Sequence, residues 1–414
     1  MALKRLRETA EAAPEDRGAL AARAFERHAK LADKAFKTLG DMKGVALKAG
    51  QMLSYMDGAI PAEYADVYQQ VLERLQQSAP ALRWSTIRPT LEAEIGPLGE
   101  VFAKIDEAPF AAASIGQVHR AERLDGRVVA VKVQYPGVAK AMSSDLKNAE
   151  LFHALLTPFM GIMGANRKTR RYIKAIMEEL EARLLEELDY EREAAMQTRF
   201  RELLADEPDV VIPEVHADLS TGRVLVSELV RGRTLSEVCE TAPQRERDRY
   251  GQILARVMLR CLYELGLFNA DPHPGNYLFP ADGRVCLLDF GCVKEIPPWM
   301  RRDMLDYVTD AIIATRTDAP EDWARFDVTL GKALHLDGSD PLVFRLYREF
   351  SLYIMRPALH DAPFDFTSAY TKESIDRVLD GAKEAIFAGR KIPRLPDLPP
   401  VPPDYTMLNR LQWG

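Results

Sequence analysis

The sequence of 414 residues predicts an α+β protein built from two lobes, with a β-rich lobe first and a larger helical lobe after it. The chain exceeds the length at which one hydrophobic core stops growing. Short β-rich runs fall between residues 101 and 133, whereas helical periodicity dominates after residue 232. The hydrophobic fraction of 47% and the charged fraction of 28% are sufficient for the cores and the surface of both lobes.

The first part of the chain is predicted to be a helical extension, residues 1–85, because apolar side chains recur every three or four residues between 31 and 53. Three antiparallel strands follow in the prediction, at 101–105, 114–124 and 127–134. The pair Asp125-Gly126 is a strong signal for a hairpin turn between the last two strands.

A long helix is predicted at 168–204, and two more β-like runs at 210–215 and 222–229 follow it. The chain then becomes mainly helical and ends in a proline-rich segment that is typical of an extended tail. We therefore expect three segments after the extension: a β-rich lobe at 86–230, a helical lobe at 231–390 and the tail at 391–414.

Charge, cysteine spacing and hydropathy limit which partners and which cellular location we expect for this protein. A net charge of -7 offers no field for nucleic acid, which we exclude as a partner. The four cysteines lack CxxC spacing and are expected to be reduced thiols. The N-terminus lacks an apolar signal segment, and no run of about 18 apolar residues occurs. We expect a cytoplasmic protein, with peripheral contact to the inner membrane left open.

Asp271 and Asp289 are the strongest chemical signals. Asn276 follows Asp271 at the spacing of the catalytic Asp and the metal-binding Asn in the protein-kinase catalytic loop. Asp289 ends an apolar strand and precedes Phe290 and Gly291. Phosphoryl transfer needs Mg²⁺ on the phosphate oxygens and a carboxylate aimed at the attacking group, so Asn276 and Asp289 are candidate metal ligands and Asp271 the candidate catalytic residue. Taken singly, Asn276 is equally compatible with a helix cap, and Asp289 with an ordinary turn.

Lys132 lies in a predicted strand among apolar neighbours, where an ammonium group needs a partner if both faces of the strand are covered. A kinase requires such a lysine at the nucleotide phosphates, and a glutamate on a helix that pairs with it. The acidic run 186–191 offers this partner, and Glu187 is the candidate.

The segment from Pro109 to Ala121 occupies the place of a glycine-rich phosphate loop. It carries alanines instead, and a methyl group restricts the backbone at a turn that must approach phosphates. Glu228, which precedes the helical lobe, fits a hinge whose backbone could hydrogen-bond adenine. The candidate nucleotide contacts of this region are Ala111, Ala112, Ala113, Ser114, Gly116, Gln117 and Glu228.

Lys48 and Gln51 stand three residues apart on one face of a predicted helix, and Gly50 permits close approach of another backbone. On the residues alone, a solvated lysine beside a packing point explains this pattern.

Together these motifs resemble the ABC1/UbiB/AarF family of protein-kinase-like proteins, over roughly residues 48–294. The motifs that carry the resemblance are KxGQ at Lys48–Gln51, AAASIGQVH at Ala111–His119, VKVQYPG from Val131, ExD at Glu187–Asp189, DPHPGN at Asp271–Asn276 and DFG at Asp289–Gly291. One departure is Asn269, since many members carry His or Gln two residues before the catalytic Asp.

The resemblance implies binding of ATP or ADP with Mg²⁺, slow ATPase activity, and a role in isoprenoid quinone or other lipid metabolism, with a lipid or quinone precursor as a further ligand. It also implies that the helix of Lys48 and Gln51 lies over the groove where ordinary kinases accept a protein. Lys48, Gln51 and Asp189 are then regulatory residues, and Glu187 is favoured as the partner of Lys132. Two alternatives stay open: a kinase that phosphorylates a small-molecule or protein hydroxyl, and a nucleotide-gated scaffold without enzymatic activity.

Overall fold

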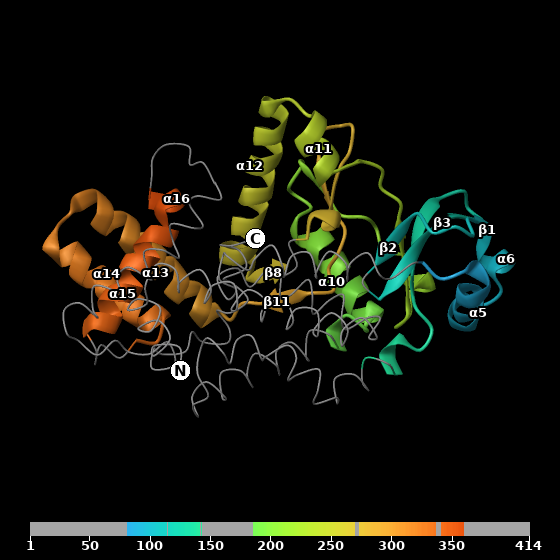
Figure 1. Ribbon diagram of the computed structural model, residues 1–414, viewed down its shortest axis with the longest axis horizontal. Helices are drawn as coiled ribbons and strands as arrows, with labels where there is room; N and C mark the ends of the chain where they lie inside the picture. The colour runs from blue at the N-terminus through green and yellow to red at the C-terminus, as the bar shows by residue number, and fades with distance from the viewer. Residues whose placement is uncertain are drawn as a thin grey trace, which may run out of the picture.

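The computed structural model describes residues 81–113, 115–140, 142, 185–269, 273–336 and 341–359. Within these ranges a β-rich lobe, a mixed central region and a distal group of helices follow one another along the longest axis of the molecule (Figure 1). The predicted α+β class is confirmed. Most of the predicted extension and the whole predicted tail lie outside the described residues.

The β-rich lobe is an antiparallel sheet in the order β1-β3-β4-β6, with the short strand β2 paired to one end of β3. Asp125 and Gly126 form the turn between β3 and β4 as predicted, and Gly126 has a φ of 83° that suits glycine. The strands are β1 (Phe102–Ile105), β2 (Ala111–Ala113), β3 (Gly116–Arg123), β4 (Val128–Gln134) and β6 (Val224–Glu228).

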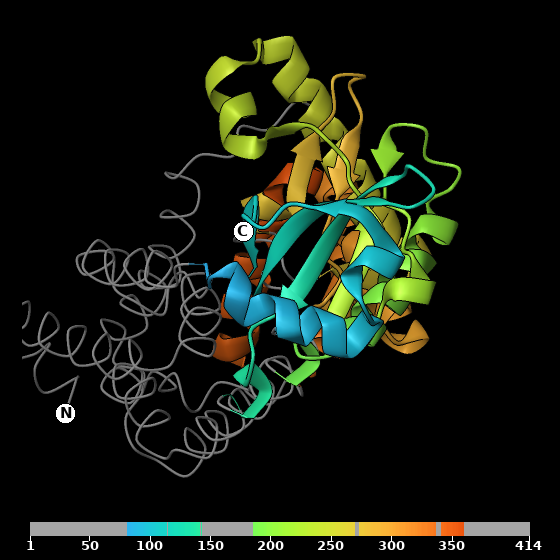
Figure 2. The same ribbon diagram turned by 90° about the vertical axis from the view of Figure 1, so that its right-hand side faces the viewer.

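Helices α5 (Trp84–Ile95) and α6 (Leu98–Val101) belong to this lobe, and α5 lies across one face of its sheet (Figure 2). Ile87 and Leu91 of α5 share a hydrophobic core with alternate valines of β4 and β6. Because side chains alternate along a strand, Val129, Val131 and Val133 point into this core. The residues between them, including Lys132, therefore lie on the opposite face, toward the central region.

Helix α10 (Tyr190–Leu203) crosses from the sheet to the central region, and its buried side chains recur with helical period. The predicted single helix at 168–204 is wrong within the described part, because residues 187–189 form a turn before α10 begins. Asp189 is the N-cap of α10, and its Oδ1 accepts a hydrogen bond from the Arg192 N–H at 3.0 Å. A carboxylate at this position satisfies a free helix N–H and favours a new helix start.

The central region combines helices with two small sheets. One sheet has the order β5-β10-β9-β7, and the other pairs β8 with β11. The helices of the central region are α11 (Leu235–Thr241) and α12 (Gln244–Arg260). A π-helical turn (Cys261–Leu265) follows α12 directly. The strands are β5 (Val210–Val211), β7 (Arg233–Thr234), β8 (Leu267–Asn269), β9 (Tyr277–Phe279), β10 (Val285–Leu287) and β11 (Val293–Glu295).

The core of the central region joins α10 and α12 to these strands, and it includes Phe200, Tyr250, Phe279 and Phe290. The sheets thus carry the segments of Asn276 and Asp289, while α10 connects the Asp289 segment to the β-rich lobe.

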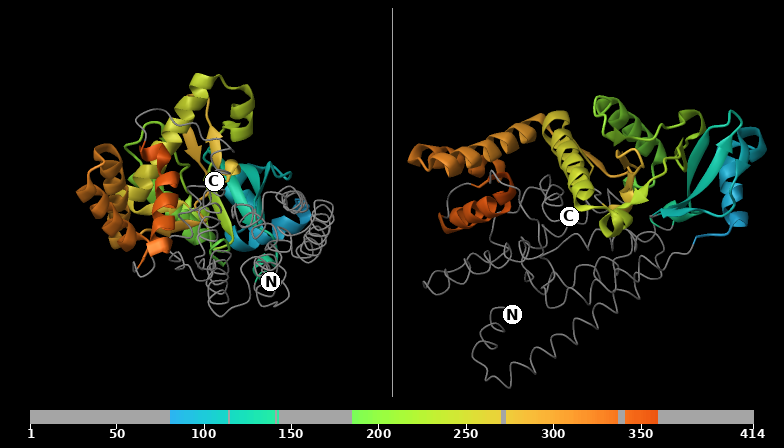
Figure 3. Two further views of the ribbon diagram at one scale, coloured as in Figure 1. Left: turned by 60° about the vertical axis from the view of Figure 1, so that its left-hand side comes forward. Right: turned by 90° about the horizontal axis from the view of Figure 1, so that it is seen from above.

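The distal helices are α13 (Pro298–Thr317), α14 (Pro320–Ala333), α15 (Pro341–Ile354) and α16 (Arg356–Leu359). They form a group at the end of the molecule opposite the β-rich lobe (Figure 3), around a core that includes Ala311, Phe326 and Leu330. Among the described residues, none of the helices has the length and apolar character needed to cross a lipid bilayer.

Candidate nucleotide site

Lys132 is the residue around which the site is built. Its Nζ donates to both carboxylate oxygens of Glu193, at 2.7 Å and 2.9 Å, and lies 3.5 Å from Oδ2 of Asp289. The three residues come from β4, from α10 and from the loop after β10. The ion pair therefore connects the β-rich lobe to the central region through the first turns of α10.

Burial and charge set the ionisation of this cluster. Burial by itself lowers the pKa of Lys132, but the carboxylates of Asp289 and Glu193 raise it well above its ordinary value, so the ammonium stays charged. Burial raises the pKa of Glu193 to about 7, against the opposing effect of Lys132, and the negative charge of Asp289 adds to the rise. Lys132 is thus a charged ammonium group that Glu193 and Asp289 hold in place.

The structure corrects the predicted partner of Lys132. The carboxylate that binds Lys132 is that of Glu193, whereas the sequence favoured Glu187. The reason is the turn at 187–189, which places Glu187 before the helix, while Glu193 lies one turn inside α10 on its buried face. Glu187 is nevertheless close to Glu193. A Cβ added to Gly291 would lie within 3.8 Å of both Oε1 of Glu187 and Oε2 of Glu193.

Tyr190 is a second residue that sequence reasoning missed. Its ring lies beneath Lys132, with Nζ 4.9 Å from the ring centroid, and the side chain is fully buried. A cation over an aromatic face is stabilised electrostatically, more so where water is excluded. Tyr190, Glu193 and Gln197 share the buried stripe of α10. A glutamate within such a stripe is the sequence signal that could have identified Glu193.

Asp289 and Asn276 are brought together by the pairing of β9 with β10. The register Leu287↔Tyr277 continues with a hydrogen bond from the Leu288 N–H to the Asn276 carbonyl at 3.0 Å, so Asn276 faces the residue that precedes Asp289. Oδ1 of Asp289 accepts from the Gly291 N–H at 2.9 Å, and the side chain is 24% exposed.

A carboxylate and a carboxamide are hard oxygen donors, the kind that Mg²⁺ prefers, and this ion usually takes its other ligands from phosphate and water. Asp289 and Asn276 therefore fit a Mg²⁺ ion that binds together with a nucleotide. Within the described ranges, no group of three or more His, Cys, Asp or Glu side chains is placed to hold a metal ion, so the other ligands of such an ion would come from phosphate and water.

Three contacts fix the segment of Asp289 against its surroundings. Asn269 donates from Nδ2 to the backbone carbonyl of Asp289 at 2.6 Å, so the residue that departs from the family pattern supports this loop directly. The guanidinium of Arg192 donates to the carbonyls of Gly291 and Val293, each at 3.2 Å. Phe290 packs on Phe200 of α10, with ring centroids 5.0 Å apart. Helix α10 and the Asp289 loop are therefore coupled.

The alanine segment forms a hairpin. Ala111, Ala112 and Ala113 are strand β2 and pair with Val118, Gln117 and Gly116 respectively. Directly paired residues share a face of the sheet. Val118 is opposite Lys132 in the next strand pair, so Ala111 and its i+2 neighbour Ala113 lie on the Lys132 face, and Ala112 lies on the other.

Gly116 is required by close packing, because a Cβ at this position would lie 2.2 Å from the carbonyl oxygen of Val133. Gln117 is placed differently from the prediction. Its side chain is fully buried and hydrogen-bonded to Leu82 and His119, on the face of the sheet opposite Lys132. The Gln117 side chain is therefore not placed to contact a nucleotide on the Lys132 face, which corrects the prediction. Its role is structural, behind the hairpin.

Glu228 ends β6 and begins the connection to the central region. Its backbone N–H donates to the Glu214 carbonyl at 2.8 Å, and the Leu229 N–H donates to the Val128 carbonyl at 3.2 Å. The backbone N–H groups of Glu228 and Leu229 are therefore both used within the protein.

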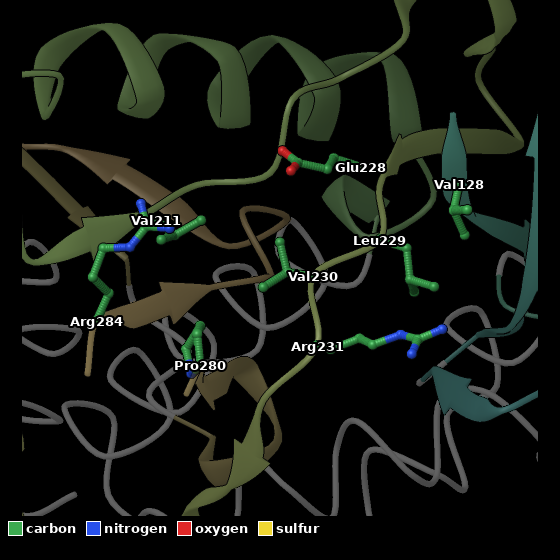
Figure 4. Close-up of a pocket in the computed structure, with 8 residues that line it drawn as sticks. All are labelled: Val128, Val211, Glu228, Leu229, Val230, Arg231, Pro280 and Arg284. Atoms are coloured by element: carbon green, nitrogen blue, oxygen red, sulfur yellow. The ribbon is translucent and has the colours of Figure 1, made fainter. Parts of the chain in front are cut away.

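The same connection lines a pocket of about 430 Å³ between the two regions (Figure 4). Its lining residues are Val128, Val211, Glu228, Leu229, Val230, Arg231, Pro280 and Arg284.

Several predicted site residues lie outside the described residues: Asp271, Ser114, Lys48 and Gln51. Asp271 is bracketed by residues that are described, since Asn269 precedes it and His273 follows it. Asp189 is described, and it caps α10 as stated above.

In this site a lysine on a β-strand pairs with a glutamate on a helix, and both lie beside a loop that carries Asp-Phe-Gly. This arrangement defines a protein-kinase-like fold. Comparison with known families agrees, because the ABC1 atypical kinase-like domain matches residues 74–321 of this chain. The chain belongs to the ABC1 family of atypical kinase-like proteins.

Two curated relatives are similar over the same region. The chain is 40% identical over 266 residues to the mitochondrial atypical kinase COQ8B of Rattus norvegicus, covering 64% of this chain and 48% of that protein. It is 39% identical over 273 residues to the mitochondrial atypical kinase coq-8 of Caenorhabditis elegans, covering 64% of this chain and 34% of that protein. The chain therefore matches less than half the length of these relatives.

Among solved structures, the complex of Rv3197 with erythromycin from Mycobacterium tuberculosis is similar, with a TM-score of 0.54 and 28% sequence identity. The superposition covers 88% of this chain and 94% of the Mycobacterium protein.

Proposed function

We propose that this chain binds ATP or ADP with Mg²⁺ between the β-rich lobe and the central region, and that it hydrolyses ATP or transfers its γ-phosphoryl group slowly. The observation that carries the proposal is the convergence of Lys132, Glu193 and Asp289 from three separate elements. In a phosphoryl-transfer site, catalysis is mostly positioning and electrostatic stabilisation, for which this cluster is suited.

Each residue has a stated role in the proposal. Lys132 binds nucleotide phosphate oxygens while Glu193 keeps its ammonium group in position. Asp289 and Asn276 hold Mg²⁺, which supplies positive charge to the phosphates when it is bound. Asp271 orients the attacking water or hydroxyl, or accepts its proton. Ala111 and Ala113 form the phosphate-side wall with Ser114 and Gly116, and the backbone after Glu228 binds the adenine.

The cellular role we propose is in isoprenoid quinone or other lipid metabolism. It is supported by the family resemblance and by the similarity to relatives named COQ8B and coq-8. A lipid or quinone precursor is the corresponding ligand class, and peripheral membrane contact is part of the proposal. The cytoplasmic location and the domain boundaries stay predictions.

One experiment separates the proposal from its alternatives. Phosphate release from Mg-ATP is measured with purified protein, with and without lipids and hydroxylated acceptors, for the parent chain and for Asp271→Asn. Slow release that Asp271→Asn lowers by about 10²-fold supports the proposed ATPase. A phosphorylated acceptor identifies a kinase instead. Nucleotide binding with no turnover in either protein identifies a nucleotide-gated scaffold.

A further inference from the structure

Gln117 joins the alanine hairpin to the segment that leads into helix α5. The Leu82 N–H donates to Oε1 of Gln117 at 2.8 Å, and Nε2 of Gln117 donates back to the Leu82 carbonyl at 3.3 Å. The second hydrogen of the same amide group points to Nε2 of His119 at 2.9 Å. The Gln117 amide is completely buried, so each of these contacts replaces water.

The chemistry of His119 fixes the direction of this network. Its Nδ1 lies 2.9 Å from the backbone carbonyl of Asp106, which only accepts, so Nδ1 carries the proton. Nε2 of a neutral His119 is then the acceptor that the Gln117 amide requires. Gln117 thus forms a two-bond clamp on Leu82, and the neutral imidazole sets its orientation.

Protonation of His119 is incompatible with this clamp. A proton on Nε2 would face the NH₂ group of Gln117, so two donors would meet. Rotating the amide by half a turn would relieve this conflict, but the NH₂ group would then face the Leu82 N–H and the amide oxygen would face the Leu82 carbonyl. Burial lowers the pKa of His119, while the backbone and charge of Asp106 raise it. The other charged groups nearby are Lys104 and Arg120, which lie 3.5 Å and 3.6 Å from the Asp106 carboxylate. The ring of Trp84 covers His119, with centroids 5.2 Å apart.

The position of the clamp connects two parts of the proposed site. Gln117 follows Gly116 and pairs with Ala112, so it lies directly behind the hairpin whose other face carries Ala111 and Ala113. Leu82 is where the chain arrives from the predicted extension with Lys48 and Gln51. We propose that Gln117, oriented by neutral His119, is a positioning residue that sets the alanine hairpin for nucleotide binding and ties it to the segment that leads into α5. This inference rests on the proposed function.

The test compares Gln117→Met with Gln197→Met in the full chain. Methionine keeps the length of glutamine and removes the amide. Gln197 of α10 is a matched control because it is also buried. Its Nε2 donates to the Pro213 carbonyl at 2.8 Å. Two quantities are measured: amide hydrogen exchange in peptides that cover residues 81–86, and the Mg-ATP dissociation constant at pH 8. We expect Gln117→Met to speed the exchange about tenfold and to weaken Mg-ATP binding about three- to tenfold, with neither change in Gln197→Met.

A second variant, His119→Gln, isolates the role of the ring. Its carboxamide can accept from Gln117 and donate to Asp106 without titrating, so we expect affinity near that of the parent at pH 8. Between pH 8 and pH 5 the parent should lose more affinity than His119→Gln, since only the parent gains a proton at this position. Equal losses would overturn the role of neutral His119.

The remaining outcomes are distinct. Faster exchange with Mg-ATP affinity within twofold of the parent makes the clamp purely structural and overturns the positioning role. Unchanged exchange in Gln117→Met shows that the clamp does not hold Leu82. If the parent itself binds no Mg-ATP, the proposed function fails and the positioning role fails with it, while the exchange data still report whether the clamp exists.

Discussion

The ammonium group of Lys132 is bound by both oxygens of Glu193, from an element 61 residues later in the chain. This pair holds α10 against β4, and α10 in turn contacts the Asp289 loop through Arg192 and Phe200. The position of one helix therefore determines whether Lys132 and Asp289 face the same space.

Glu193→Gln removes the charge that positions Lys132. We expect Mg-ATP affinity to fall about tenfold and turnover by about 10²-fold, because Lys132 then pairs more closely with Asp289 and is withdrawn from phosphate. Glu191→Gln is the matched control, since Glu191 is exposed on the same helix. Isothermal titration and phosphate release measure the two effects. Identical values for the two variants would remove Glu193 from the site.

The raised pKa of Glu193 predicts an unusual pH dependence of stability. A carboxyl group with a pKa of about 7 in the folded protein, against the ordinary 4.5, takes up a proton on folding between these values. Its contribution to the unfolding free energy is thus fully present below pH 4.5 and is lost as the pH rises through 7, on the order of 3 kcal/mol in all.

The measurement is the difference in unfolding free energy between the parent and Glu193→Gln, by urea denaturation without nucleotide from pH 4.5 to 8. The advantage of the parent should shrink steadily with rising pH. A difference that does not shrink over this range would show that the pKa of Glu193 is not raised in the folded protein.

Asn269 is expected to act through the Asp289 backbone. Asn269→Ala removes the 2.6 Å hydrogen bond to the Asp289 carbonyl, and we predict a three- to tenfold loss of turnover, about the effect of one buried hydrogen bond. Asn269→His, the residue of many family members, should restore part of the loss. The rate of phosphate release at saturating Mg-ATP measures the turnover of each variant. A fully active alanine variant would leave Asn269 without a role in the site.

Gly116→Ala tests the packing of the alanine hairpin. A methyl group there would meet the Val133 carbonyl at 2.2 Å, so we predict a loss of more than about 2 kcal/mol in unfolding free energy. Gly251→Ala in α12 is the control, because nothing lies within 4 Å of its added Cβ. Alanine in an exposed helix should stabilise by roughly 0.5–1 kcal/mol. Thermal unfolding of both variants gives the comparison, and equal melting temperatures would refute the proposed close contact.

Much of the fold was predictable because it depends on local pattern. The Asp125-Gly126 turn and the valine alternation around Lys132 indicate the hairpin of β3 and β4, and the structure contains it. The Asp-Phe-Gly segment after an apolar strand likewise indicated the Asp289 loop. In both cases neighbouring residues along the chain carry the signal.

What the sequence did not predict depends on contacts between distant residues. Glu187 and Glu193 are both acidic and six positions apart, and only the helix start at Asp189 decides which one faces Lys132. Gln117 belongs to the same motif as the alanines, but strand alternation directs its side chain to the face opposite Ala111 and Ala113. Asn269 became interpretable only when β8 brought it next to the Asp289 carbonyl.

We propose that Asp289 and a divalent metal ion together hold the nucleotide beside Lys132. The most direct measurement is ATP affinity by equilibrium titration in Mg²⁺ and in a metal chelator, for the parent and for Asp289→Asn. We predict that the parent binds at least about tenfold more tightly with Mg²⁺, and that Asp289→Asn loses most of this difference because one carboxylate ligand is gone. Equal ATP affinity of the parent with Mg²⁺ and with chelator would show that no metal ion links Asp289 to the nucleotide.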